Sequence, residues 1–302
     1  MRIRLVAALL ALSVTTGCAG RAAASGFTAG RLNVVTAFYP LRFLADRITG
    51  GTARVSDLTK PGAEPHDVEL NPRQVAQIVD AGLVVHLRGF QPAVDQAVGQ
   101  EAPDRALDVG SVVPLLPLST GPTDEAESAH GMDPHLWLDP QRFATVADAV
   151  AARLAQADPA RAAEYRQRAG VLHTELAALD AEFGARLKTC TRREIVTSHS
   201  AFNYLAARYG LTQVGITGIS PEAEPSPRRL AAVAAEARRT GTTTIFFETL
   251  VSPKVAETLA REVGARTAVL DPLEGLTAPG ADYFSVMRGN LTALSTALGC
   301  TS

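Results

Sequence analysis

Short apolar runs alternate with longer amphipathic stretches along most of the chain after residue 31. Runs typical of buried strands cover residues 32–38, 55–58, 83–87 and part of 107–116, and later 194–199, 213–216, 243–247 and 267–270. Stretches with helical spacing cover residues 40–48, 139–157, 202–209, 228–239, 253–263 and 283–298, and a further one starts at residue 72. Because strands that alternate with helices form parallel sheets, this pattern predicts an α/β fold with one parallel sheet in each half.

One helical stretch is much longer than the others. Asp158 and Pro159 are typical of a helix start, and Ala, Leu and charged residues continue at helical spacing to residue 187. At about 1.5 Å per residue this helix would be on the order of 40 Å long, and it could act as a stiff strut. The predicted organisation is therefore a signal segment (1–18), a flexible tether (19–31), an N-terminal lobe (32–157), a linking helix (158–187) and a C-terminal lobe (188–302).

The first residues have the pattern of an export signal. A basic start precedes the apolar residues 5–14, a run too short to cross a bilayer. The sequence around Cys18 resembles the lipobox of bacterial lipoproteins, although Thr15 stands where an aliphatic residue is usual. Cleavage of an ordinary signal peptide near residues 22–24 is the alternative. We expect an exported protein, either anchored through a lipid on Cys18 to the outer face of the cytoplasmic membrane or periplasmic.

The cysteines and the net charge bear on covalent cross-links and on the class of binding partner. Without Cys18, the chain keeps Cys190 and Cys300, and an even pair in an exported protein predicts a disulfide. Two unpaired thiols are the alternative. The net charge of −2, without any Lys/Arg block, gives no indication of a nucleic-acid partner.

Four loops spaced almost evenly along the chain each carry a potential metal ligand, and these are His66, His135, His199 and Asp271. Open α/β sheets bind ligands at the carboxyl ends of their strands, where several of these loops begin. Three imidazoles and one carboxylate can complete the ligand shell of a borderline-soft cation such as zinc. Calcium and magnesium prefer oxygen ligands.

Glu64 and the other histidines have contexts that indicate a metal-binding role less specifically. Glu64 could orient an imidazole or act as an accessory ligand. His130 lies in a polar, acidic stretch and could capture metal, with an ordinary surface histidine as the alternative. His86 is expected to be a partly buried strand residue with a satisfied ring, and His173 to face solvent on the long helix.

The chain resembles a known family, the zinc/manganese-binding lipoproteins that serve ABC transporters (cluster A-I solute-binding proteins). The likeness spans roughly residues 32–300. Six strings in order carry it: EPHDVEL (64–70), DPHLWLDP (133–140), TSHSAF (197–202), GISPEAEPSP (218–227), FE with SPK (247–248 and 252–254) and LDPL (270–273).

The resemblance implies two α/β lobes joined by a long rigid helix, with a metal in the interlobe cleft. It implies ligands at His66, His135, His199 and Asp271. Zinc-preferring members carry His at the third position and manganese-preferring members carry Glu, so His199 favours zinc. The chain departs from many zinc members because only His130 stands where they have a His-rich loop, and His86 replaces a Tyr found in some members.

The sequence therefore predicts a monomeric, extracytoplasmic, high-affinity zinc-binding protein, not an enzyme, that delivers Zn²⁺ to an ABC transporter permease and its ATPase. A manganese (Mn²⁺) protein of the same type, an adhesin and a metallochaperone are the alternatives. A zinc hydrolase is less favoured, because no His-Glu-x-x-His helix is present and the fourth loop supplies a closing carboxylate.

Overall fold

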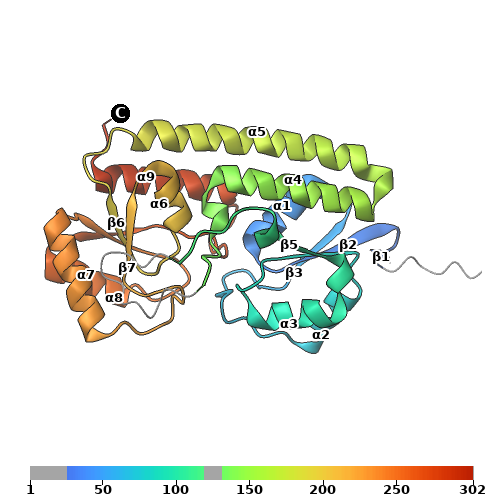
Figure 1. Cartoon of the computed structure of the whole chain (residues 1–302), viewed down its shortest axis with the longest axis horizontal. Helices are drawn as coiled ribbons and strands as arrows, with labels where there is room; N and C mark the ends of the chain where they lie inside the picture. The colour runs from blue at the N-terminus through green and yellow to red at the C-terminus, as the bar shows by residue number, and fades with distance from the viewer. Residues whose placement is uncertain (1–25, 119–130, 302) are drawn as a thin grey trace, which may run out of the picture.

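The computed structural model describes residues 26–118 and 131–301, which form two α/β lobes beneath a shared layer of helices (Figure 1). In the first lobe, β3, β2, β4 and β5 are hydrogen-bonded in that order and run parallel, and β1 pairs antiparallel with β2. The strands are β1 (Phe27–Thr28), β2 (Arg31–Thr36), β3 (Arg54–Asp57), β4 (Leu83–His86) and β5 (Ala106–Asp108). The helices of this lobe are α1 (Tyr39–Thr49), α2 (Pro72–Val79) and α3 (Pro92–Glu101).

The second lobe contains a four-stranded parallel sheet in the order β7-β6-β8-β9. A core of its own lies between this sheet and two of its helices, and Val196, Val233 and Leu259 belong to it. The strands are β6 (Glu194–Thr197), β7 (Thr212–Gly215), β8 (Thr244–Phe247) and β9 (Arg266–Val269). The helices are α6 (Asn203–Tyr209), α7 (Pro227–Thr240), α8 (Lys254–Val263) and α9 (Tyr283–Leu298).

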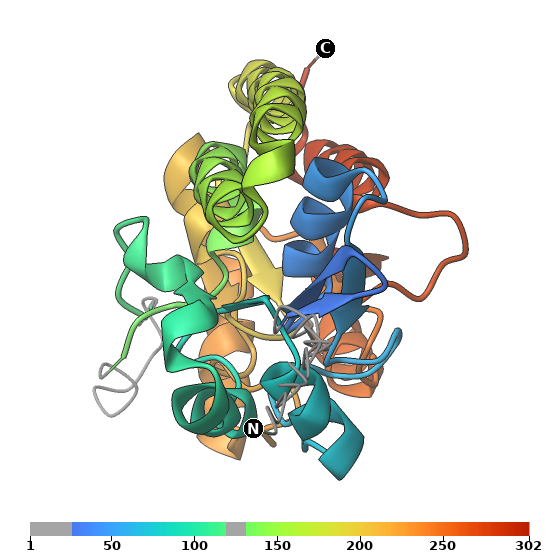
Figure 2. The same ribbon diagram turned by 90° about the vertical axis from the view of Figure 1, so that its right-hand side faces the viewer.

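Two long helices, α4 (Pro140–Ala157) and α5 (Ala162–Leu187), pack against each other, and α4 also contacts α1 and β4 of the first lobe. Helix α5 contacts α1 of the first lobe and α9 of the second, and it lies above α4 when the molecule is viewed along its long axis (Figure 2). Its apolar stripe is fully buried in a core shared by both lobes. The two-lobed α/β fold with a long connecting helix is therefore confirmed.

The start of the long helix differs from the prediction. Residues Pro159–Arg161 form a 3₁₀ turn, and the α-helix begins at Ala162 rather than at residue 158. The side chain of Asp158 does not cap the helix, because its Oδ2 accepts hydrogen bonds from Arg161 Nη1 and Tyr165 Oη at 2.9 Å each.

The predicted tether is also too long. Residues Phe27–Thr28, which fall within it, form β1 and pair with β2 across Ala29 and Gly30, both in the left-handed region. Two consecutive residues of this conformation are typical of a tight β-hairpin, so the folded domain begins before residue 32. The predicted signal segment and Cys18 lie outside the described residues. Within the described part of the chain, no helix combines the length and apolarity needed to cross a bilayer.

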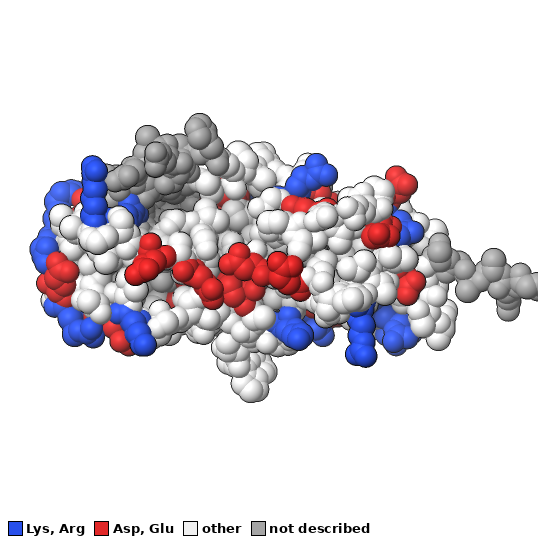
Figure 3. Space-filling view, turned by 90° about the horizontal axis from the view of Figure 1, so that it is seen from below, with Lys and Arg blue, Asp and Glu red and all other residues white. Residues whose placement is uncertain are grey.

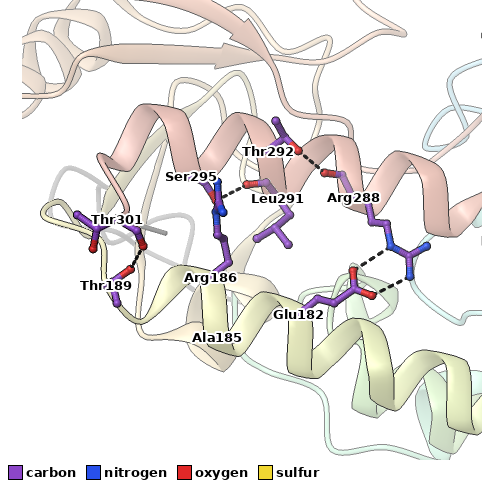
Figure 4. Close-up of a pocket in the computed structure, with 9 residues that line it drawn as sticks. All are labelled: Glu182, Ala185, Arg186, Thr189, Arg288, Leu291, Thr292, Ser295 and Thr301. Carbon is purple, nitrogen blue, oxygen red and sulfur yellow. Dashed lines mark hydrogen bonds and ion pairs between the residues drawn. The ribbon is translucent and has the colours of Figure 1, made fainter.

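The C-terminus is fastened to the end of α5 by polar contacts and a disulfide. Glu182 pairs with Arg288 through two hydrogen bonds of 2.9 Å, and Thr189 Oγ1 donates to the carbonyl of Thr301 at 2.5 Å (Figure 4). Just beyond α5, Cys190 is bonded to Cys300, 110 residues later in the sequence. The predicted disulfide is therefore confirmed.

Replacement of both bridge cysteines, Cys190→Ser with Cys300→Ser, is expected to lower the free energy of unfolding by about 4 kcal/mol, because the unfolded chain regains the entropy of a long open loop. Urea unfolding of the metal-free protein measures this change. The wild type should lose similar stability in reductant, and the double variant should not respond to reductant. Equal stability of the two proteins without reductant would contradict a formed bridge.

Candidate metal centre

His66 lies in the loop that follows β3 of the first lobe. Its ring is buried edge-on against Phe90, with ring centroids 4.5 Å apart, and this packing leaves little room for other orientations. The backbone N–H of His66 donates to Glu64 Oε1 at 2.9 Å, so the side chain of Glu64 shapes the same loop.

His135 lies just before a 3₁₀ turn, Leu136–Leu138, that leads into α4. Asp133 Oδ1 accepts hydrogen bonds from both the backbone N–H of His135, at 2.9 Å, and its ring Nδ1, at 2.7 Å. Because Nδ1 is held by the carboxylate, Nε2 is the atom that remains to bind a ligand. Both side chains are fully buried.

His199 follows β6 of the second lobe and is oriented in the same way. Its Nδ1 lies 2.7 Å from Oε1 of Glu248, which follows β8 and also accepts a hydrogen bond from Ser198 Oγ at 2.7 Å. The backbone carbonyl of His199 accepts from Gln213 Nε2 at 3.0 Å. A buried carboxylate thus fixes this imidazole too, and its Nε2 turns toward the other lobe.

Glu274 brings the three rings together. Its Oε1 lies 3.2 Å from Nε2 of His66, 2.9 Å from Nε2 of His135 and 3.3 Å from Nε2 of His199. One donor atom from each of these four buried residues lies within 4.8 Å of every other. A tetrahedral zinc ion with bonds of about 2.0–2.1 Å needs donor atoms roughly 3.3 Å apart, so the arrangement is close to that of a four-ligand site.

Asp271, the predicted fourth ligand, is not part of this cluster. Its Oδ1 accepts a hydrogen bond from the backbone N–H of Leu273 at 2.8 Å, and its Oδ2 accepts one from Thr249 Oγ1 at 3.0 Å. The carboxylate therefore stabilises the turn after β9. Glu274, three residues later, lies beside the three histidines, where the fourth ligand was expected. We correct the fourth candidate ligand from Asp271 to Glu274.

Two further carboxylates, Asp133 and Glu248, were also missed as functional candidates by the sequence analysis. Asp133 stands two residues before His135, and Glu248 directly follows a predicted strand. Both positions were visible in the sequence, but only the fold shows that each carboxylate reaches the Nδ1 atom of a clustered histidine.

The charges of the cluster depend strongly on one another. Burial would lower the pKa of His199, but the negative charges of Glu274 and Glu248 outweigh it and raise the pKa to about 10. Burial is likewise outweighed at His135, where Asp133 and Glu274 raise the pKa, whereas at His66 burial prevails and the pKa is lowered. The three imidazoles hold the pKa of Glu274 well below its usual value, despite its burial.

Several buried polar atoms around the cluster have no hydrogen-bond partner among the residues that the structure describes. They include one oxygen each of Glu64, Asp133, Glu248 and Glu274, and Nε2 of His199. Such atoms are costly in a protein interior unless an ion or a water satisfies them. A divalent cation between the four donor atoms would bind His199 Nε2 and Glu274 and offset part of the negative charge of the surrounding carboxylates.

The other candidates are arranged as follows. Glu64 lies beside the cluster, with Oε1 4.0 Å from His66 Nε2, and burial and the charge of Glu274 raise its pKa to about 8. His86 is buried with Nδ1 3.2 Å from Asp95, and His173 is half exposed beside Asp148. His130 lies outside the described residues.

The face of the molecule opposite α5 is strongly acidic along its middle. Acidic side chains form a band there, and basic side chains lie mostly toward the edges (Figure 3). A negative field of this kind raises the local concentration of cations.

The chain is similar to proteins whose names describe zinc binding or zinc uptake. The zinc-binding protein AdcA of Streptococcus pyogenes serotype M3 is 36% identical over 286 residues, covering 88% of this chain and 56% of its own length. The chain thus spans little more than half of that relative. The high-affinity zinc uptake system protein ZnuA of Bacillus subtilis is 33% identical, with 97% of this chain and 96% of that protein covered.

The chain is also similar to a solved structure over nearly the whole length of that structure. The Zn(II)-bound ZnuA-like domain of Streptococcus pneumoniae AdcA matches with a TM-score of 0.76 and 34% identity, covering 89% of this chain and 99% of the domain. The family model described as zinc-uptake complex component A, periplasmic, matches residues 34–297. The chain therefore belongs to the ZnuA family of zinc-uptake components.

Proposed function

We propose that this protein captures Zn²⁺ outside the cytoplasm through His66, His135, His199 and Glu274 and delivers it to an ABC transporter permease. The observation that carries the proposal is the position of Glu274 Oε1, between 2.9 and 3.3 Å from three buried Nε2 atoms. The names of the relatives, which bind zinc or belong to zinc uptake systems, support the same cation.

The donor set favours zinc over manganese. Three imidazole nitrogens and one carboxylate oxygen suit a borderline-soft, four-coordinate cation, whereas manganese is better served by oxygen ligands. Asp133 and Glu248 add to this preference, because a carboxylate on Nδ1 makes an imidazole a stronger ligand and fixes its direction.

The proposed site is closed rather than catalytic. The family consists of solute-binding components of zinc uptake systems, not enzymes. Four protein donors complete the tetrahedral shell that is typical of non-catalytic zinc sites, whereas catalytic sites keep a position for water. The hydrolase alternative has no support from this arrangement.

The proposed ligands come from both lobes, which suits capture and delivery by one molecule. His66 and His135 belong to the first lobe, and His199 and Glu274 to the second. Because a single chain supplies the whole site, we infer that the protein acts as a monomer. We further propose that a lipid on Cys18 holds it at the outer face of the cytoplasmic membrane, near the permease and its ATPase.

Metal analysis of individual variants tests the proposed ligands. The stripped wild type, offered equimolar zinc and manganese at pH 7.5, should take up one zinc per chain. Changing the histidine to alanine at position 66, 135 or 199 should weaken zinc binding by at least about a hundredfold, since each removes one of four bonds. His199→Glu should shift uptake toward manganese, because it adds an oxygen donor.

His173→Gln is the matched control, since it removes an exposed histidine of α5 and should leave zinc uptake unchanged. Mass spectrometry of the bound metal gives the readout. Manganese retention by the wild type, or full zinc uptake by all three alanine variants, would refute the assignment.

Zinc affinity is expected to fall as the pH is lowered. Zinc binds the unprotonated imidazole, so a proton on Nε2 competes with it. Because the pKa of His199 is about 10 and that of His135 is raised, the metal-free site carries protons at neutral pH that zinc must displace. Affinity should therefore rise by at least about tenfold per pH unit between pH 6 and 9.

Competition with a chromophoric chelator across this range, together with calorimetry in buffers of different ionisation enthalpy, measures the affinity and the released protons. A zinc affinity that is the same at pH 6 and pH 8.5 would rule out this description of the site.

A further inference from the structure

The turn that carries Glu274 contains an unusual backbone conformation. Leu273, directly before Glu274, has a φ of 62° and is completely buried. A branched, non-glycine residue rarely adopts the left-handed region, because its Cβ approaches the following carbonyl oxygen. The isolated turn would disfavour this conformation by about tenfold or more, so other contacts must hold it in place.

Asp271 supplies the contact closest to the strained residue. Its Oδ1 accepts the backbone N–H of Leu273 at 2.8 Å, the hydrogen bond of an Asx turn, which replaces a backbone turn bond. Its Oδ2 accepts a hydrogen bond from the hydroxyl of Thr249 at 3.0 Å, so both oxygens of the Asp271 side chain are held in place. One carboxylate oxygen is thus bonded to the turn and the other to Thr249 after β8, and Asp271 is not among the residues of the metal cluster.

Two buried side chains hold the same turn from outside. Asn290 of α9 accepts the backbone N–H of Asp271 at 2.9 Å and donates to the carbonyl of Asp271 at 2.7 Å. Trp137 of the first lobe donates Nε1–H to the carbonyl of Pro272 at 2.7 Å. The backbone from Asp271 to Leu273 is therefore tied to both lobes at successive residues immediately before Glu274.

We propose that Asp271 is a positioning residue that holds Leu273 in its left-handed conformation and so keeps the carboxylate of Glu274 preorganised beside the three imidazoles. The inference rests on the proposed function, because it concerns the affinity of the same zinc site. Without the Asx-turn bond, the turn would relax toward ordinary backbone angles, and zinc would have to reorder it on binding.

Two replacements of Asp271 separate positioning from direct ligation. Asp271→Ala removes both acceptors and should weaken zinc binding by about tenfold, the value of one hydrogen bond to the backbone, with one zinc still bound per chain. Asp271→Asn keeps an acceptor for Leu273 and a polar group for Thr249, and should stay within about threefold of the wild type. A chelator competition assay at pH 7.5 measures the affinities.

A second pair of variants tests the backbone conformation itself. In the Asp271→Ala protein, Leu273→Gly and Leu273→Ala both remove the buried side chain, but only glycine adopts the left-handed region without steric cost. The glycine variant should therefore bind zinc about fivefold more tightly than the alanine variant, or better. At an ordinary backbone position the two would bind equally, or alanine more tightly.

Hydrogen exchange of the metal-free proteins provides a readout that does not depend on zinc. The amide of Leu273 should exchange faster in Asp271→Ala than in the wild type or in Asp271→Asn. If Asp271→Ala does not fold, Asn290→Ala removes the two hydrogen bonds to Asp271 and should accelerate the same exchange.

Equal losses of zinc affinity in Asp271→Asn and Asp271→Ala would overturn the proposal, because they would indicate that the charge or a metal bond matters. No loss in either variant, or equal binding by the glycine and alanine variants at position 273, would also overturn it. Failure of the wild type to bind zinc would instead refute the proposed function, and the exchange rates would still decide whether Asp271 holds the turn.

Discussion

Burial of one carboxylate among three imidazoles is the constraint on which this structure depends. Glu274 is fully buried, and its charge is compensated by the three imidazoles whose Nε2 atoms lie 2.9–3.3 Å from its Oε1. His135 and His199 are in turn held through Nδ1 by Asp133 and Glu248, so a further carboxylate fixes two of the three imidazoles. Preorganisation of this kind lowers the cost of binding a cation, because the ligands are already gathered.

The site is also part of the packing between the lobes. Tyr204 of α6 donates to the carbonyl of Asp133 at 2.7 Å, and Tyr283 of α9 donates to the carbonyl of Trp137 at 2.7 Å. Trp137 itself donates to the carbonyl of Pro272, next to the turn of Glu274. The residues that flank His135 thus contact the second lobe directly, and the shared core beneath α5 supports the same interface. Capture of a cation therefore couples to an interface that is already formed.

Much of the fold and three of the four proposed ligands could be predicted from the sequence. Apolar runs of strand length and helices with proline at their first turn gave two α/β lobes, and the loops of His66, His135 and His199 follow from that pattern. Asp271 was predicted as a ligand because its Leu-Asp-Pro sequence resembles a ligand loop. Glu274 was missed because no local sequence pattern indicates the left-handed conformation of Leu273 that precedes it. The hairpin of β1 was hidden in a Gly- and Ala-rich stretch, and its pairing depends on a partner strand.

Diffraction from zinc-loaded crystals, recorded on both sides of the zinc absorption edge, shows directly whether His66, His135, His199 and Glu274 bind the ion. One strong anomalous peak is expected, about 2.0–2.2 Å from Nε2 of His66, His135 and His199 and from a carboxylate oxygen of Glu274. Asp271 should remain bonded to the N–H of Leu273. A peak away from these four residues, or one bound by Asp271 in place of Glu274, would contradict this set of ligands.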